Sequence, residues 1–172
     1  MVLTQERAEA RGSVIQRSSI HYNFNITFEK GDNYSGYAEL TFTLSSVPLS
    51  LPLDFSGKSV TRLLINGHLT ECKIEDGFIL LEVGKLVVGK NVVAVHYLCS
   101  YDNDGQGCVS FVDVDQKQYI YTQFESYFAN RVIPCFDQPD LKADMKLNVI
   151  SPSDWKKVLS NETANIEQDF QA

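Results

Sequence analysis

One stretch of the sequence, Tyr119 to Ala143, concentrates residues whose types could do chemistry. It is dense in aromatic side chains and also carries polar and charged groups: Gln123, Glu125, Arg131, Asp137, Asp140 and Lys142. Amide and carboxylate groups on a loop could bind a polar or charged ligand, because binding residues concentrate on loops held by a rigid scaffold. The alternative is that the aromatic side chains only close one end of the folded domain.

The three histidines, His21, His68 and His96, do not indicate a metal site or a nucleophilic site. None belongs to a His-Glu-x-x-His sequence, which places two zinc ligands on one face of a helix. The chain also has no Gly-x-Ser-x-Gly elbow and no glycine-rich phosphate loop. We therefore expect solvated or singly hydrogen-bonded histidines, no catalytic residue and no metal ligand in this chain.

Four aspartates lie around two glycines: Asp102, Asp104, Asp113 and Asp115, with Gly105 and Gly107 between them. Carboxylates near glycines can indicate a calcium loop. Here the flanking residues have a strand pattern rather than the two helices that flank such a loop, so the helix-loop-helix pattern fails. We interpret the cluster as a solvated, turn-forming segment rather than a metal site.

The composition argues against two classes of partner. The chain has 15 Lys and Arg against 22 Asp and Glu, a formal net charge of -7, which repels phosphate backbones and anionic membrane surfaces. No apolar run approaches the roughly 20 residues of a membrane-spanning helix. The first residues are polar where a secretory signal would have an apolar core. We therefore expect a cytoplasmic protein that binds neither nucleic acid nor a membrane.

The four cysteines, Cys72, Cys99, Cys108 and Cys135, lie far apart and form no Cys-x-x-Cys pair. Metal sites built from cysteine and histidine need these residues close together in characteristic spacings. We predict buried or free thiols, with one disulfide pair as the alternative.

Short alternating segments predict the elements that position the chemistry-bearing loop. Ile20, Tyr22, Phe24, Ile26 and Phe28 take every second position, which is typical of a half-buried strand. Alternation or short apolar runs recur at residues 37–44, 51–55, 60–65, 78–83, 92–98, 108–114, 118–124 and 145–150. Turn signals such as asparagine-glycine separate them and indicate antiparallel hairpins. We predict an all-β fold, an antiparallel β-sandwich.

The domain organisation predicted from these patterns has three parts. Residues 1–15 form a helical segment at the surface, with Thr4 as a possible cap. Residues 16–152 form the sandwich, interrupted by a proline-containing loop at 134–139, because proline supplies no backbone donor to a sheet. Residues 153–172 form a polar tail or a linker towards a further domain.

A run of motifs resembles a known family. Gln123-Phe124-Glu125, followed after eight residues by the segment Pro134–Ala143, resembles the hallmark of the first domain in aminopeptidase N-type zinc metallopeptidases, the gluzincins. Further matches follow the family's order: Leu53–Gly57, Leu64–Gly67, Leu86–Asn91, Gly105–Gly107 and Ser160-Asn161. Leu3–Arg11 is similar to the start of cytosolic members, so the resemblance covers nearly the whole chain.

The resemblance implies a saddle-shaped β-sandwich beside a thermolysin-like catalytic domain, with one loop lining the active site. Gln123 matches the glutamine that borders the first side-chain pocket. Glu125 matches the residue that holds the free amino terminus of the substrate, and a carboxylate in a water-poor pocket favours an ammonium over a neutral amide. We expect Arg131, Asp137 and Asp140 to tie the loop down.

Two positions depart from the family's pattern: Asn130 stands where an arginine is frequent, and Ser126 where many relatives have proline. The family's zinc motif and oxyanion tyrosine have no match here, so the resemblance implies a domain that is not catalytic alone, with zinc in a catalytic domain of the same parent chain. Its partners would be that domain and the peptide amino terminus. The alternative is a stand-alone, non-catalytic sandwich used as an interaction or structural subunit; a sugar-binding sandwich rests on fold class only.

Overall fold

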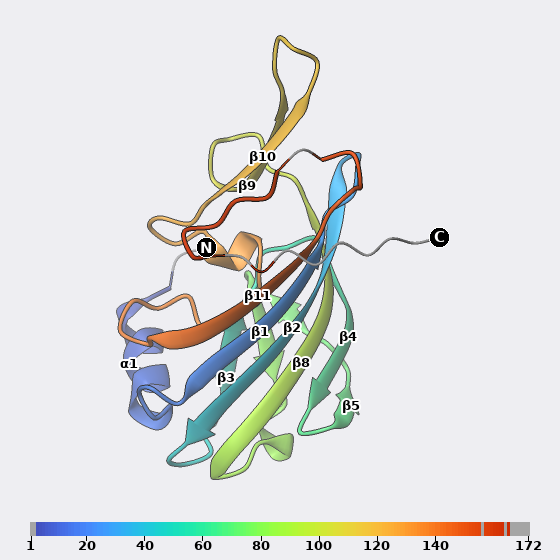
Figure 1. Ribbon diagram of the computed structural model, residues 1–172. Helices are drawn as coiled ribbons and strands as arrows, with labels where there is room; N and C mark the ends of the chain where they lie inside the picture. The colour runs from blue at the N-terminus through green and yellow to red at the C-terminus, as the bar shows by residue number, and fades with distance from the viewer. Residues whose placement is uncertain (1–2, 156, 164, 166–172) are drawn as a thin grey trace.

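The computed structural model describes residues 3–155, 157–163 and 165 of the chain. One helix, α1 (Gln5–Val14), precedes a curved six-stranded sheet with the strand order β11-β1-β2-β8-β4-β5 (Figure 1). The strands of this sheet are β1 (Ile20–Thr27), β2 (Asn33–Leu44), β4 (Ser59–Ile65), β5 (His68–Thr70), β8 (Gly89–Ser100) and β11 (Ala143–Ile150).

A three-stranded sheet forms the second layer, with the order β3-β7-β6. Its strands are β3 (Leu51–Asp54), β7 (Phe78–Leu81) and β6 (Ile74–Glu75), and the short helix η1 (Val83–Lys85) follows β7. Leu53 and Ile79 from this sheet share one buried core with Leu40 and Val95 of the large sheet. The all-β sandwich predicted from the sequence is therefore confirmed.

A two-stranded hairpin, β9 (Gly107–Val112) and β10 (Gln118–Gln123), projects from one end of the molecule (Figure 1). The short helix η2 (Ala129–Arg131) follows it and leads into the proline-containing loop. This hairpin delivers the chemistry-bearing segment to the end of the sandwich.

The period-two pattern explains which strands face the core. In β2 the residues from Ala38 to Leu44 alternate between buried and half-buried, and β8 alternates in the same way from Asn91 to Cys99. Successive side chains of a strand point to opposite faces of the sheet. One face of each strand therefore packs on the three-stranded sheet, and the other meets solvent.

One strand pairing differs from the predicted hairpins. β11 lies parallel to β1, with Met145 opposite Tyr22 and Leu147 opposite Phe24. A parallel pair needs a long crossover connection, which a search for local hairpins does not find. Met145 and Leu147 share the core-facing side of the sheet but remain 59% and 42% exposed, whereas Phe24 is 1% exposed.

The helix α1 lies at the surface, as its polar composition predicts, except at one residue. Thr4 caps it as expected, since its Oγ1 accepts a hydrogen bond of 3.3 Å from the Arg7 backbone N–H. However, Arg11 is only 2% exposed. A charged side chain can be buried when the fold supplies partners for it, and the partners of Arg11 lie elsewhere in the chain.

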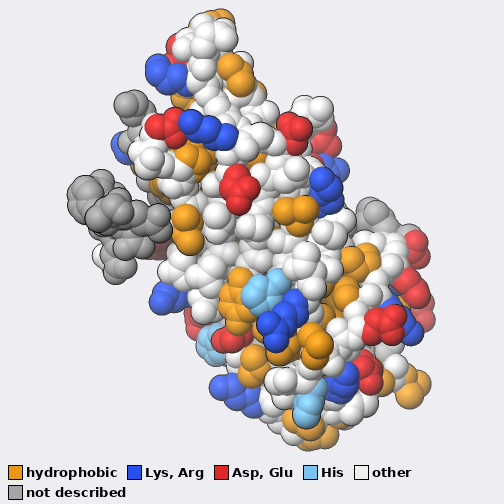
Figure 2. All heavy atoms as spheres, turned by 90° about the vertical axis from the view of Figure 1, so that its right-hand side faces the viewer, with side chains coloured by type: hydrophobic (Ala, Val, Ile, Leu, Met, Phe, Trp, Pro, Cys, Tyr) orange, Lys and Arg blue, Asp and Glu red, His pale blue; other side chains and the backbone are white. Residues whose placement is uncertain are grey.

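All four cysteines are free thiols, with Cys99, Cys108 and Cys135 buried and Cys72 half-buried. This confirms the prediction from their spacing. Among the described residues no helix is long and apolar enough to cross a membrane. On the face drawn in Figure 2, acidic and basic side chains are interspersed with hydrophobic ones.

Gly36 on β2 allows Tyr97 of β8 to lie across the core side of the sheet. The two residues are direct partners in the ladder, and a Cβ added at Gly36 would lie 2.2 Å from the ring of Tyr97. Tyr97 is 2% exposed and packs edge-on against Phe55, so its ring has no free direction in which to move.

We therefore expect Gly36→Ala to lower the free energy of unfolding by about 1–3 kcal/mol through overpacking. The control is Gly84→Ala, because no atom beyond its own chain neighbours lies within 4 Å of the corresponding Cβ position, and we expect a change of less than about 1 kcal/mol there. Urea denaturation measures both. Equal effects of the two substitutions would contradict this account of the sheet.

Candidate functional site

The two residues singled out for substrate binding lie on one exposed turn at the end of β10. Gln123 is the last residue of that strand, and both Gln123 and Glu125 are exposed. The Glu125 N–H donates a 3.3 Å hydrogen bond to Gln123 Oε1. The Phe128 N–H donates a 3.0 Å bond to the Phe124 carbonyl and closes the backbone around Glu125. We call residues 123–128 the Glu125 turn.

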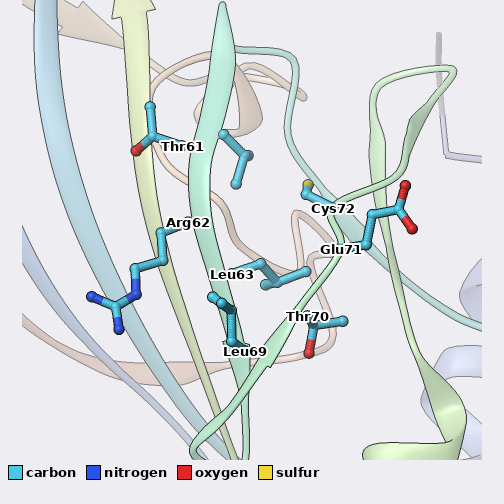
Figure 3. Close-up of a pocket in the computed structure, with 8 residues that line it drawn as sticks. Thr61, Arg62, Leu63, Leu69, Thr70, Glu71 and Cys72 are labelled. Atoms are coloured by element: carbon cyan, nitrogen blue, oxygen red, sulfur yellow. The ribbon is translucent and has the colours of Figure 1, made fainter.

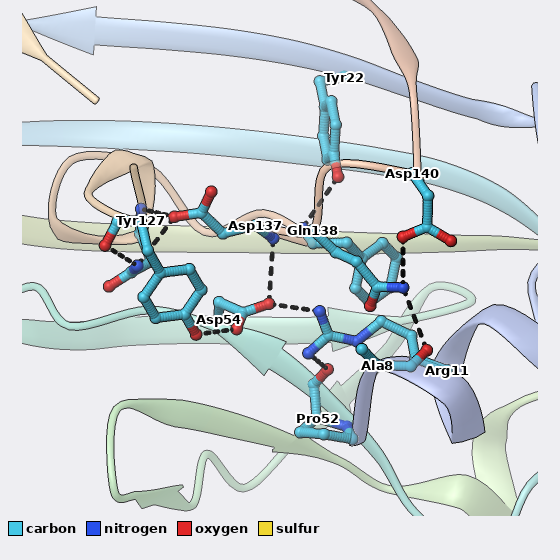
Figure 4. A network of polar contacts seen from close by, with 11 residues as sticks. Ala8, Arg11, Tyr22, Pro52, Asp54, Tyr127, Asp137, Gln138 and Asp140 are labelled. Carbon is cyan, nitrogen blue, oxygen red and sulfur yellow. Dashed lines mark hydrogen bonds and ion pairs between the residues drawn. The ribbon is translucent and has the colours of Figure 1, made fainter. Parts of the chain in front are cut away.

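A fully buried ion pair lies behind this turn (Figure 4). Arg11 Nη1 of α1 is 2.7 Å from Asp54 Oδ2 at the end of β3, and both side chains are 0% exposed. Arg11 Nη2 also donates a 3.0 Å hydrogen bond to the Pro52 carbonyl. The guanidinium carbon lies 5.3 Å from the centroid of the Phe136 ring. Arg11 therefore joins the helix to the strand and to the loop after η2.

Asp54 is the acceptor at which three segments of the chain meet. The Tyr127 hydroxyl donates to Asp54 Oδ1, and the Asp137 N–H donates a 3.1 Å hydrogen bond to Asp54 Oδ2. The backbone of Asp54 exchanges two further hydrogen bonds with Cys135, of 3.0 and 3.1 Å. Burial, together with the hydrogen bond to Asp54, raises the pKa of Tyr127, so its hydroxyl stays protonated and remains the donor.

Asn130 occupies the position at which an arginine is frequent in the resembling family, and it has its own partners. Its Nδ2 donates to Asp137 Oδ2 at 2.8 Å and to the Tyr127 carbonyl at 3.2 Å. Its backbone N–H donates to the same Asp137 oxygen at 3.1 Å. Burial raises the pKa of Asp137, while the hydrogen bonds from Asn130 oppose this rise. Asn130 thus connects the Glu125 turn to the loop after η2.

Arg131 points the other way, towards the acidic segment before β9. Its Nη1 lies 2.8 Å from Asp104 Oδ2 and 3.4 Å from Asp102 Oδ1. The hydrogen bond from Arg131 lowers the pKa of Asp104. Asp140 accepts a 2.8 Å bond from Gln138, whose Nε2 also reaches the Ala8 carbonyl at 3.1 Å. Arg131, Asp137 and Asp140 all tie loops together, as the sequence predicts.

Comparisons with known proteins match most of the chain, including the Glu125 turn. Residues 18–172 match the family described as Peptidase M1 N-terminal domain. The chain belongs to this family.

Relatives of this M1 N-terminal domain carry the name aminopeptidase. It is 32% identical over 163 residues to the aminopeptidase N of Streptomyces lividans, covering 92% of this chain and 19% of that protein. It is 28% identical over 155 residues to the probable aminopeptidase 1 of Saccharolobus solfataricus, covering 90% of this chain and 18% of that protein. The chain thus spans about a fifth of the length of the curated relatives it matches.

A solved structure supports the fold independently. The M1 N-terminal domain superposes on native leukotriene A4 hydrolase from Saccharomyces cerevisiae with a TM-score of 0.67 and 17% identity. The match covers 81% of this chain and 24% of that one. At this level of identity the likeness concerns the fold alone.

No metal centre is formed by the part of the M1 N-terminal domain that the structure describes, since no three histidine, cysteine or acidic side chains there are grouped to hold an ion. His21 Nδ1 lies 3.3 Å from Asp144 Oδ2, and the His96 ring is tilted against the Tyr37 ring with the two centroids 4.8 Å apart. These residues do not fit a zinc site.

A depression of about 470 Å³ lies between β4 and β5 (Figure 3). Its lining residues are Val60–Leu63 and Leu69–Cys72. The charged side chains of Arg62 and Glu71 point in opposite directions (Figure 3). The depression therefore offers no acid-base pair, and the Glu125 turn remains the candidate site.

Sequence reasoning missed Arg11, Asp54 and Tyr127, which hold the turn in place. One signal was present: Asp54 interrupts the otherwise apolar run of residues 51–55. A buried carboxylate inside a predicted core strand requires a partner, because an unpaired charge is too costly to bury. The identity of that partner depends on tertiary structure and could not be derived from the local pattern.

The buried pair generates a stability prediction. We expect Arg11→Met to lower the free energy of unfolding by about 3–5 kcal/mol, because the carboxylate of Asp54 would stay buried without its cation. The matched control is Arg17→Met: Arg17 pairs with Asp140 at 3.4 Å, but its side chain is 70% exposed. That control should cost at most about 1 kcal/mol. Similar losses in the free energy of unfolding for the two variants, measured by chemical denaturation, would show that the buried pair contributes no more to stability than the exposed one.

Proposed function

We propose that this M1 N-terminal domain forms one wall of an aminopeptidase active site and holds the free amino terminus of the peptide substrate. Glu125 would accept the ammonium group, and Gln123 would border the pocket for the first side chain. The observation that supports this most is the Glu125 turn itself, an exposed amide and carboxylate on a backbone anchored from behind. Hydrolysis of the peptide bond would be catalysed by zinc in a catalytic domain of the same parent chain.

The chemistry of Glu125 suits this role. When a second domain covers the turn and excludes water, a carboxylate forms strong charge-assisted hydrogen bonds with an ammonium group. A blocked amino terminus carries no charge and would leave the carboxylate buried without a counter-ion, which is costly. The result is selection for peptides with a free amino terminus. The hydrogen bond from the Glu125 backbone N–H to Gln123 Oε1 holds the Gln123 side chain beside the backbone of Glu125.

Exposed apolar side chains support the presence of a covering domain. Met145 and Leu147 lie on the core-facing side of β11 yet are largely exposed. On the projecting hairpin, Phe111, Tyr119 and Tyr121 are 44%, 42% and 45% exposed. An isolated two-stranded hairpin is marginally stable in water, and exposed apolar patches mark interaction sites. A catalytic domain that covers both β11 and the β9-β10 hairpin would explain these exposed apolar side chains.

The same exposed side chains keep a second candidate function open, a stand-alone interaction or structural subunit. The two candidates differ in what covers β11: a catalytic domain of the parent chain, or a separate protein. The second candidate requires no role for Glu125, so a substitution at that residue discriminates between them.

A cytoplasmic location belongs to the same proposal. Four free thiols, including three buried ones, support it, because paired cysteines are typical of oxidising compartments.

The test is a chimera in which this chain replaces the matching segment of the Streptomyces lividans aminopeptidase N. We expect the chimera to hydrolyse peptides with a free amino terminus. Glu125→Ala should lower kcat/KM roughly 10- to 100-fold, the effect of losing one hydrogen bond to a charged group. Glu71→Ala is the matched control, since Glu71 is an exposed carboxylate beside the depression between β4 and β5.

An inactive chimera beside an active Streptomyces enzyme would contradict the proposal. Equal activities of the Glu125→Ala and Glu71→Ala chimeras would also contradict it, and would favour the interaction subunit.

A further inference from the structure

The Glu125 turn has two ends with different attachments. At its start, Gln123 belongs to the projecting β9-β10 hairpin, where it pairs with Gly107. At its end, Tyr127 is half-buried and its hydroxyl donates to Asp54 in the interior of the sandwich. Only Ser126 separates Glu125 from Tyr127. The position of the carboxylate therefore depends directly on where the Tyr127 ring is held.

Asp54 is a fixed acceptor because its other oxygen is already engaged. Asp54 Oδ2 lies 2.7 Å from Arg11 Nη1 and accepts the Asp137 N–H at 3.1 Å. The carboxylate is 0% exposed, so water does not compete for it. Figure 4 shows Tyr127, Asp54 and Arg11 in a continuous series, from the loop through β3 to α1.

We propose that Tyr127 and Asp54 are positioning residues for Glu125, and that Arg11 on α1 fixes Asp54, so that the amino-terminal helix helps to place the substrate's amino group. This inference rests on the proposed function of Glu125 and adds the residues that set its geometry. Positioning of this kind matters for rate, because a displacement of about 1 Å can cost on the order of 100-fold in activity.

Tyr127→Phe is the discriminating variant. It removes one hydroxyl and leaves the buried pair of Arg11 and Asp54 intact, so it avoids the unfolding expected when either charge is lost. Tyr101→Phe is the matched control, because the Tyr101 hydroxyl donates a 2.9 Å hydrogen bond to the Glu29 carbonyl, outside the Glu125 turn.

The first measurement is hydrogen exchange on the 172-residue chain. In Tyr127→Phe we expect the Phe128 amide, which closes the turn, to exchange roughly tenfold faster, the effect of removing a hydrogen bond to a charged group. The Val95 amide, in the core of β8, should exchange at its wild-type rate, and Tyr101→Phe should change neither. An unchanged Phe128 rate would overturn the inference.

The second measurement is a double-mutant cycle in the Streptomyces chimera. We expect Tyr127→Phe alone to lower kcat/KM about tenfold, and to have no further effect when Glu125 is already alanine, because coupled residues are non-additive. A tenfold loss in both backgrounds would assign Tyr127 a merely structural role and overturn the inference. No loss from Tyr127→Phe, with Glu125→Ala still impaired, would overturn it while leaving the proposed function intact. No loss from Glu125→Ala would overturn both.

Discussion

The buried ion pair between Arg11 and Asp54 is the constraint on which the placement of the candidate site depends. Two charges with no exposure lose their hydration, and this cost is offset only when each charge finds several well-placed partners. The partners of Asp54 come from α1, from the Glu125 turn and from the loop after η2. Satisfying one carboxylate therefore fixes three segments that lie far apart in the sequence.

The result is a turn that is hydrogen-bonded to the interior on its buried side and exposed at Gln123 and Glu125. Asn130 and Asp137 reinforce the buried side, since they connect the turn to the following loop through hydrogen bonds of 2.8 to 3.2 Å. Precise binding sites need supporting residues of this kind, because loose side chains lose orientation. The sandwich contributes little chemistry of its own in this account, and it serves to hold Glu125 at a defined place.

Local patterns were enough to predict the longer strands but not the short strands β5 and β6, and they did not predict long-range contacts. Alternation along β1, β2 and β8 reports burial directly, so these strands could be derived from the sequence. The parallel pairing of β11 with β1 could not, because no local signal records which distant strand becomes the neighbour. Arg11 illustrates the same limit. Its place on a polar helix predicts an exposed side chain, whereas the burial of Arg11 depends on its pairing with Asp54. The substrate-binding role of Gln123 and Glu125 was inferred from the family resemblance, and it stays a prediction.

The most direct test of the central claim is a crystal structure of the chimera with a bound, non-hydrolysable peptide analogue that has a free amino terminus. The account predicts that the Glu125 carboxylate lies about 2.7–2.9 Å from the ammonium nitrogen, the distance of a charge-assisted hydrogen bond. The Tyr127 hydroxyl should still donate its hydrogen bond to Asp54. A bound analogue whose amino group is held by other residues, with Glu125 facing solvent, would contradict it.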